Sequence, residues 1–237
     1  MILSPTSAVL VHGAASTPET ALRLLGPGLA GSGLVAVDAR GSIDDVVASI
    51  EAAVRTETER GALVTAIAGL SLGAHAAARW AIDRAGSGLE LMLALPAWTG
   101  DPDAVAGLTA ASADEIERDG TAGILARLVA ANGDDWVVDE LVRSWTDADP
   151  HRIAHSLRTA AASPAPTLDE LAQITARTVV VALAGDPLHP ARVAKAWAGA
   201  IPHGRLVVVP RDAPNRDRGA LGVAARATLE GWVSGSR

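Results

Sequence analysis

The sequence contains no cysteine among its 237 residues, and it also has no phenylalanine, no tyrosine and a single lysine, Lys195. The absence of cysteine excludes disulfides, thiolate nucleophiles and cysteine-ligated metals. The core must be built from Ala, Val, Leu and Ile, with six tryptophans as its large aromatic side chains. An aromatic wall in any pocket must therefore come from Trp or His.

Long apolar runs and an excess of basic residues are also missing. No stretch approaches the ~20 apolar residues of a membrane span, and the first residues lack the basic and apolar regions of a signal peptide. The net charge is −7, from 20 basic and 27 acidic residues, which disfavours binding to nucleic acid or anionic lipid. We expect a cytoplasmic protein with a small-molecule substrate, no nucleic-acid or membrane partner and no cofactor; a homodimer remains open.

Short, continuously apolar runs recur along the chain, as is typical of buried parallel strands. They lie at residues 8–11, 34–37, 63–68, 89–95, 178–183 and 206–209. Helical stretches alternate with most of them, at residues 43–58, 72–85, 191–200 and 220–232. This βαβα pattern predicts an α/β fold with a mostly parallel sheet of about six strands, covered by helices on both faces. In such sheets the functional site lies at the carboxyl ends of the strands.

The interval 98–175 breaks this alternation, since it contains no convincing strand. Four helices are predicted in it, at residues 114–132, 134–147, 149–162 and 167–175. Asp149 precedes Pro150 as an N-cap precedes an N1 proline, and Thr167 and Glu170 have the spacing of a capping box. We therefore predict a core formed by residues 1–97 and 176–237 and a helical lid formed by residues 98–175, over the strand ends.

The segment Gly69-Leu70-Ser71-Leu72-Gly73 joins an apolar strand to an Ala-rich helix. Glycines two before and two after the serine suit a sharp strand-turn-helix elbow, because a Cβ at either position would clash with the closely packed backbone. The serine hydroxyl at the apex of such a turn is exposed to substrate. Ser71 is therefore the candidate nucleophile.

With these features, the chain resembles the α/β-hydrolase superfamily, in particular its members with a cap. Three more segments carry the resemblance: Val9-Leu10-Val11-His12-Gly13-Ala14, Asp38-Ala39-Arg40-Gly41, and Gly185-Asp186-Pro187-Leu188-His189-Pro190. The resemblance implies that Asp186 is the acid of a catalytic triad. It also implies an oxyanion hole formed by the backbone N–H groups of Ala14 and Leu72.

The sequence departs from the family at the third member of the triad. The histidine is expected after the last strand, but residues 209–219 contain none, and Pro214 or Asn215 stands near its place. His189, three residues after Asp186 at the same end of the sheet, is the tentative substitute base. The alternative is that His189 is a partly solvated loop residue without a catalytic role.

Six residues are candidates for the walls of a substrate pocket: His12, Trp98, Trp136, Trp145, His151 and His155. Core filling is the alternative for the tryptophans, and a structural role is the alternative for His12. The two lid histidines are four residues apart but lack the glutamate of a His-Glu-x-x-His zinc motif, so no metal is expected. His75, one helical turn beyond Ser71, is predicted to pack between helix and sheet.

These residues suggest an enzyme that hydrolyses a carboxylic ester or thioester of a small apolar substrate through Ser71. A serine hydroxyl is a weak nucleophile until a base removes its proton, so the prediction depends on a base being present. If none reaches Ser71, two alternatives remain. One is a non-hydrolytic lyase or isomerase that uses the oxyanion hole, and the other is a small-molecule binding protein with a degenerate triad.

Overall fold

Six parallel strands form the central sheet of the computed structural model, which describes residues 4–82, 84 and 88–234. The strands are β1 (Thr6–Val11), β2 (Gly33–Val37), β3 (Leu63–Leu70), β4 (Glu90–Ala94), β5 (Arg177–Leu183) and β6 (Gly204–Val209). Their order in the sheet is β2-β1-β3-β4-β5-β6, and every neighbouring pair is parallel. The predicted fold class is confirmed, and all six carboxyl ends lie at one edge.

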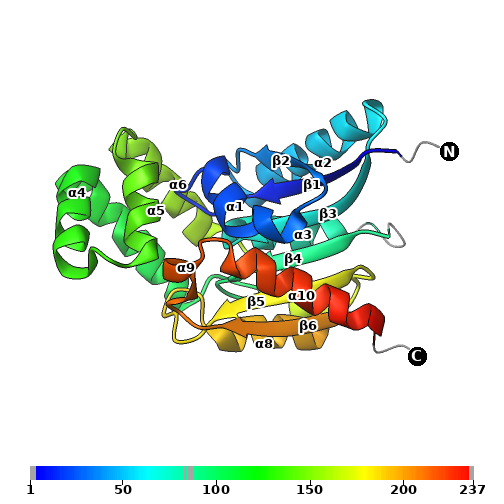
Figure 1. Cartoon of the computed structure of the whole chain (residues 1–237). Helices are drawn as coiled ribbons and strands as arrows, with labels where there is room; N and C mark the ends of the chain where they lie inside the picture. Colours follow the sequence, from blue (N-terminus) through cyan, green and yellow to red (C-terminus); the bar gives the residue numbers. More distant parts are fainter. Residues whose placement is uncertain (1–3, 83, 85–87, 235–237) are drawn as a thin grey trace.

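Helices cover both faces of this sheet (Figure 1). One face packs against α2 (Ile43–Glu59), α3 (Leu72–Ile82) and α8 (Ala191–Ala200), and the other against α1 (Pro18–Leu25), the 3-10 helix η1 (Gly26–Leu29) and α10 (Ala220–Ser234). The sequence pattern missed α1 and η1. Residues 83 and 85, at the end of the helix predicted at residues 72–85, lie outside the described residues, as do residues 1–3 and 235–237 of the predicted core.

The strand order places a crevice between β1 and β3. The helix after β1 packs on one face of the sheet and the helix after β3 packs on the other. The connections that leave these adjacent strands therefore diverge at the carboxyl edge, which is where ligands bind in open α/β sheets. The elbow at Ser71 and the loop at Gly13 lie on the two sides of this crevice.

The insertion forms a helical lid beyond the carboxyl edge, drawn in green in Figure 1. It contains α4 (Ala104–Asn132), α5 (Trp136–Trp145) and α6 (Pro150–Ala162), and α4 is broken at Gly120, whose φ is 70°. Asp149 caps α6, and a complete capping box opens α7 (Leu168–Leu171), as predicted. Because α7 contacts α3 and α8, this last helix packs with the core rather than with the lid.

Another short helix, α9 (Ala213–Arg216), lies in the connection between β6 and α10. It stands where the family resemblance places the histidine of the triad. Within the described parts of the chain, no helix, α4 included, combines the length and apolar character needed to cross a membrane.

Candidate active site

The elbow after β3 forces Ser71 into the left-handed region of backbone space, with φ of 53°. A Cβ on Gly69 would lie 2.2 Å from the carbonyl oxygen of Gly73, and one on Gly73 would lie 2.4 Å from that of Val11. Both glycines are therefore required by close backbone packing, as the sequence predicted. The strain of a non-glycine residue in this conformation, of order 1–3 kcal/mol, is tolerated because the surrounding structure fixes it.

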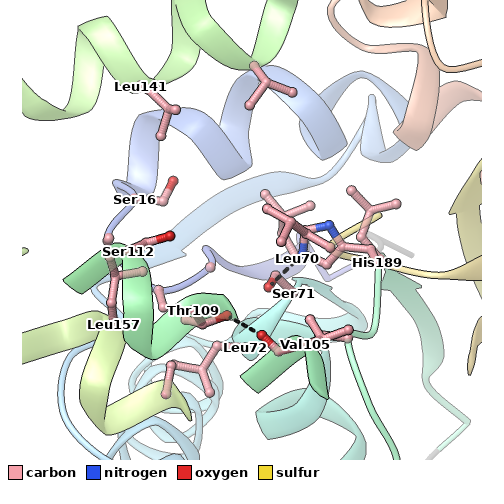
Figure 2. Close-up of a pocket in the computed structure, with 18 of the residues that line it drawn as sticks. Ser16, Leu70, Ser71, Leu72, Val105, Thr109, Ser112, Leu141, Leu157 and His189 are labelled. Atoms are coloured by element: carbon pink, nitrogen blue, oxygen red, sulfur yellow. Dashed lines mark hydrogen bonds between the residues drawn. The ribbon is translucent and has the colours of Figure 1, made fainter. Parts of the chain in front are cut away.

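His189 lies within hydrogen-bonding distance of the elbow serine. Its Nε2 is 3.1 Å from Ser71 Oγ (Figure 2), and its Nδ1 is 3.1 Å from Asp186 Oδ2. These distances fall in the range expected of a nucleophile, base and acid that act in sequence. The three side chains that the sequence proposed as nucleophile, acid and tentative base therefore lie together, with base and acid on one loop after β5.

The carboxylate of Asp186 is largely enclosed, with 8% of its side chain exposed. Burial alone would raise its pKa, but hydrogen bonds and charge from His189 and hydrogen bonds from two backbone amides outweigh burial and lower the pKa below its usual value. The amides of Leu188 and His189 donate to Oδ1 at 2.9 and 3.1 Å. Asp186 is thus held as an anion, as an orienting partner for an imidazole must be.

The loop after β6 contacts the start of the lid helix α5. The side chain of Asn215, near the position where a histidine was expected, accepts a hydrogen bond at 2.7 Å from the backbone N–H of Trp136, the first residue of α5. The indole of Trp136 donates to the Arg211 carbonyl at 3.1 Å. Arg211 and Asp135 form an ion pair at 3.4 Å. This loop therefore anchors the lid instead of supplying a base.

The two backbone amides that the family resemblance implies for an oxyanion hole, those of Ala14 and Leu72, belong to residues that line the cavity near Ser71. Leu72 begins α3, so its N–H points along the start of the helix without an intrahelical acceptor. Gly13 approaches the nucleophile so closely that a Cβ there would lie 3.2 Å from Ser71 Cβ, and Ala14 follows it. Ala14 and Leu72 both line the cavity above the serine.

The lid fixes the loop that carries Ala14. The indole Nε1 of Trp145 donates to the carbonyl of Ala15 at 2.7 Å, and the amide of Ala15 donates to Ser156 Oγ at 3.1 Å. Ala15 itself has a positive φ of 53°. Lid and oxyanion loop are therefore coupled by hydrogen bonds on both sides of one strained residue.

A cavity of about 470 Å³ lies between Ser71 and the lid. The three tryptophans proposed as pocket walls, Trp98, Trp136 and Trp145, all line it. Lid side chains enclose its far end, and Figure 2 shows Leu141 and Leu157 among them. The further apolar lid residues in this wall are Val105, Ile116, Ile124, Leu128 and Val137. The space suits an apolar group attached to the atom that Ser71 attacks.

Three predicted pocket residues are placed elsewhere, and these predictions were wrong. His12 is buried beside the cavity, where its Nδ1 donates to the Gly13 carbonyl at 2.7 Å and its Nε2 accepts from Ala39 N–H at 2.9 Å. It therefore holds two loops together and does not line the cavity. His151 and His155 are exposed, because α6 buries Ile153 and Ala154 and leaves the histidine face to solvent.

The sequence analysis did not assign His75 to the cavity. His75 was expected only to pack between helix and sheet, and it is fully buried in α3, but it also contributes to the cavity wall. Burial, followed by the charge of His189, lowers the pKa of His75 to about 3. Its position one helical turn after the nucleophile was the signal available in the sequence. Across the described ranges, no cluster of three or more His, Asp or Glu side chains could hold a metal ion.

No protein-family model matches the chain, and no curated protein matches it in sequence. Solved structures match it over nearly its whole length. MenH from S. aureus superposes with a TM-score of 0.70 and 15% identity, covering 99% of this chain and 94% of MenH. An esterase from Exiguobacterium antarcticum gives 0.70 and 18%, with coverage of 98% and 92%.

An enol-lactonase from Burkholderia xenovorans LB400 is similar to the same extent, with a TM-score of 0.70, 14% identity and coverage of 98% of this chain and 92% of the lactonase. These likenesses, at low sequence identity, concern the fold. The chain therefore has the α/β-hydrolase fold, with the six-stranded parallel sheet and the helical insert described above.

Proposed function

We propose that this protein is a serine hydrolase that cleaves a carboxylic ester or thioester with an apolar acyl group. The observation that carries the proposal is the continuous chain of contacts from Ser71 Oγ to His189 Nε2, and from His189 Nδ1 to Asp186. A base within 3.1 Å is what converts a serine hydroxyl into a nucleophile. The esterase and the enol-lactonase of the same fold are consistent with this class of reaction.

In the proposed reaction, Ser71 Oγ attacks the acyl carbon while His189 Nε2 accepts the hydroxyl proton. The negative charge that develops on the carbonyl oxygen is bound by the amides of Leu72 and Ala14. The tetrahedral intermediate collapses to an acyl-serine, and His189 returns the proton to the departing alkoxide or thiolate. His189 then takes a proton from water, which attacks the acyl-serine and releases the carboxylic acid and free Ser71.

The lining of the cavity supports a position for the acyl group on the lid side. Its wall beyond Ser71 is formed mostly by apolar lid side chains, whereas His189, Asp186 and Arg211 lie on the side of the β5 and β6 loops. Binding of an apolar acyl chain against such a wall is favoured by roughly 25 cal/mol for each Å² of apolar surface that is removed from water. The leaving group would then depart on the side of His189, which must protonate it.

The lyase, isomerase and binding-protein alternatives rested on the lack of a base near Ser71. Because an imidazole nitrogen lies 3.1 Å from the serine, that reason is removed. No contact among the described residues favours one of these alternatives over hydrolysis.

The test is hydrolysis of p-nitrophenyl esters together with labelling by a fluorophosphonate. Ser71→Ala should lower kcat by about 10⁴-fold or more, because nucleophile removal leaves only oxyanion binding and positioning, and the label should disappear. Ser49→Ala is the matched control: this serine lies on α2, where its hydroxyl bonds to the Asp45 carbonyl. Equal rates in wild type and Ser71→Ala, without labelling of the wild type, would contradict the proposed function.

A further inference from the structure

His75 has an enclosed position beside the nucleophile. It follows Ser71 by four residues on α3, none of its surface is exposed, and it contributes to the wall of the cavity. The ring packs edge-on against Trp98, with 5.0 Å between centroids, and at a tilt against Trp197, at 5.3 Å. The orientation of the imidazole is therefore fixed by two tryptophans.

Hydrogen bonding fixes the tautomer of this ring. The backbone N–H of Ala97 donates to His75 Nε2 at 3.0 Å, so Nε2 carries a lone pair and no proton. Because the pKa of His75 is lowered to about 3, the ring is neutral near pH 7. A neutral imidazole whose Nε2 is unprotonated carries its proton on Nδ1. His75 therefore presents an N–H donor at Nδ1.

This donor has no acceptor in the described part of the protein, although Nδ1 is buried. The hydroxyls on the opposite wall are different: Thr109 and Ser112 donate to the carbonyls of Val105 and Leu108, one turn earlier on α4. A buried donor without an acceptor is unfavourable, and such donors are generally satisfied by a ligand or an ordered water. Because the His75 side chain contributes to the cavity wall and no described residue accepts from Nδ1, a ligand in the cavity is a candidate acceptor.

We propose that His75 determines specificity by donating a hydrogen bond from Nδ1 to an oxygen on the acyl chain of the substrate. This inference rests on the proposed hydrolase function and narrows its substrate class to acyl groups that are mainly apolar but carry one keto or similar oxygen. Four residues of helix separate His75 from Ser71, about 6 Å of axial rise. The oxygen therefore belongs a few bonds from the carbonyl carbon that Ser71 attacks.

Two esters of matched shape test this. p-Nitrophenyl levulinate and p-nitrophenyl isocaproate share one acyl skeleton, and a ketone oxygen in the first replaces a methyl group in the second. The background rate measured with Ser71→Ala is first subtracted. Each kcat/KM value is then divided by the rate constant for alkaline hydrolysis of the same ester, which corrects for the difference in intrinsic reactivity. The wild type should prefer levulinate by roughly 3- to 10-fold, the size of effect expected of one hydrogen bond.

Two variants separate the two nitrogens of His75. His75→Gln carries its amide oxygen near the position of Nε2, so it can still accept from Ala97, but it has no donor where Nδ1 lies. His75→Asn carries its amide group near Nδ1 and falls short of Ala97. The preference for levulinate should vanish in His75→Gln and should be at least partly retained in His75→Asn.

An unchanged preference in folded His75→Gln, or no preference in the wild type, would overturn the proposal and leave the donor to a buried water. Failure of the proposed function is a separate result, namely no Ser71-dependent hydrolysis of either ester. In that case thermal stabilisation by ethyl levulinate and ethyl isocaproate is compared in wild type and His75→Gln. Preferential stabilisation by levulinate that is lost in the variant supports the hydrogen bond, and equal stabilisation overturns it.

Discussion

The loops after β5 and β6 leave adjacent strands at the same edge of the sheet, but they do different work. The first carries both Asp186 and His189, which contact each other and Ser71. The second, where the family resemblance places the histidine, uses Asn215 and Arg211 to hold the first turn of a lid helix. In the proposed triad the position of the imidazole relative to Ser71 matters, and the loop from which it comes does not.

Asp186 and His189 are only three residues apart, and they contact each other because the two carboxylate oxygens of Asp186 accept from different groups. Oδ1 accepts the amides of Leu188 and His189, which turns the chain back over the carboxylate. Oδ2 is then left to receive Nδ1 of His189. One side chain therefore shapes the loop and orients the imidazole.

The largest expected change in kcat comes from moving the histidine from the loop after β5 to the loop after β6. His189→Ala should lower kcat by about 10⁴-fold or more in p-nitrophenyl ester hydrolysis, as loss of a triad base does. Adding Asn215→His to that variant should not restore activity, because the side chain at 215 is exposed and directed to the amide of Trp136. Recovery of a substantial fraction of kcat in the double variant would show that the β6 loop can still supply the base.

A slightly smaller effect is expected at the acid. In Asp186→Asn, Oδ1 can still accept the loop amides, but the amide nitrogen cannot accept from His189 Nδ1 and favours the wrong tautomer. We expect kcat to fall by roughly 10³- to 10⁴-fold, with little change in KM. Steady-state kinetics and an unchanged far-UV circular dichroism spectrum check this, and an unaltered kcat would exclude Asp186 from the chemistry.

Removing the lid anchor should affect stability more than chemistry. Asn215→Ala deletes the acceptor for Trp136 N–H, a loss of about 0.5–1.5 kcal/mol in the free energy of unfolding. For a chain of this size the melting temperature should fall by roughly 2–4 °C per kcal/mol, as measured by calorimetry. The Ser71-dependent kcat should stay within about threefold of the wild type, in contrast to the His189 variant; a loss comparable to that of His189→Ala would contradict the division of tasks.

The smallest effect is a pH dependence of stability. The pKa of Asp186 is lower in the folded protein than its usual value, so its contribution to stability is complete above the unfolded pKa of about 3.8 and is lost as pH falls through the folded pKa. The melting temperatures of wild type and Asp186→Asn should therefore converge on acidification from pH 5 to pH 3. A constant difference over this range would contradict a depressed pKa.

Much of the fold was predictable because its signals are local. Buried parallel strands are short apolar runs, and all six were found in the sequence within a few residues of their true bounds. Helix α1 and η1 were missed because the segment Gly26-Pro27-Gly28 resembles a loop. In the structure Gly28 packs against α10, where a Cβ on it would lie 2.0 Å from the Gly222 carbonyl oxygen. The first lid helix was predicted to begin at residue 114, whereas α4 begins at Ala104, because α4 has no clear amphipathic pattern across its break at Gly120.

The site was predictable to the extent that it depends on the elbow. Local backbone sterics require Gly69 and Gly73, so Ser71 and the amide of Leu72 could be placed from sequence alone. Which way a histidine ring faces depends on packing instead. His151 and His155 point to solvent because of how α6 docks, and His12 turns into a loop contact because Ala39 lies beside it.

The parallel sheet, the helical insertion, the elbow and the candidate side chains Ser71, Asp186 and His189 could be predicted from residue type, spacing and backbone geometry. The contact between His189 and Ser71, and the His75 donor that has no acceptor among the described residues, became visible in the folded protein alone. Both facts depend on contacts between segments far apart in the chain. A distance of a few ångströms between such segments is set by packing, and no local pattern in the sequence encodes it.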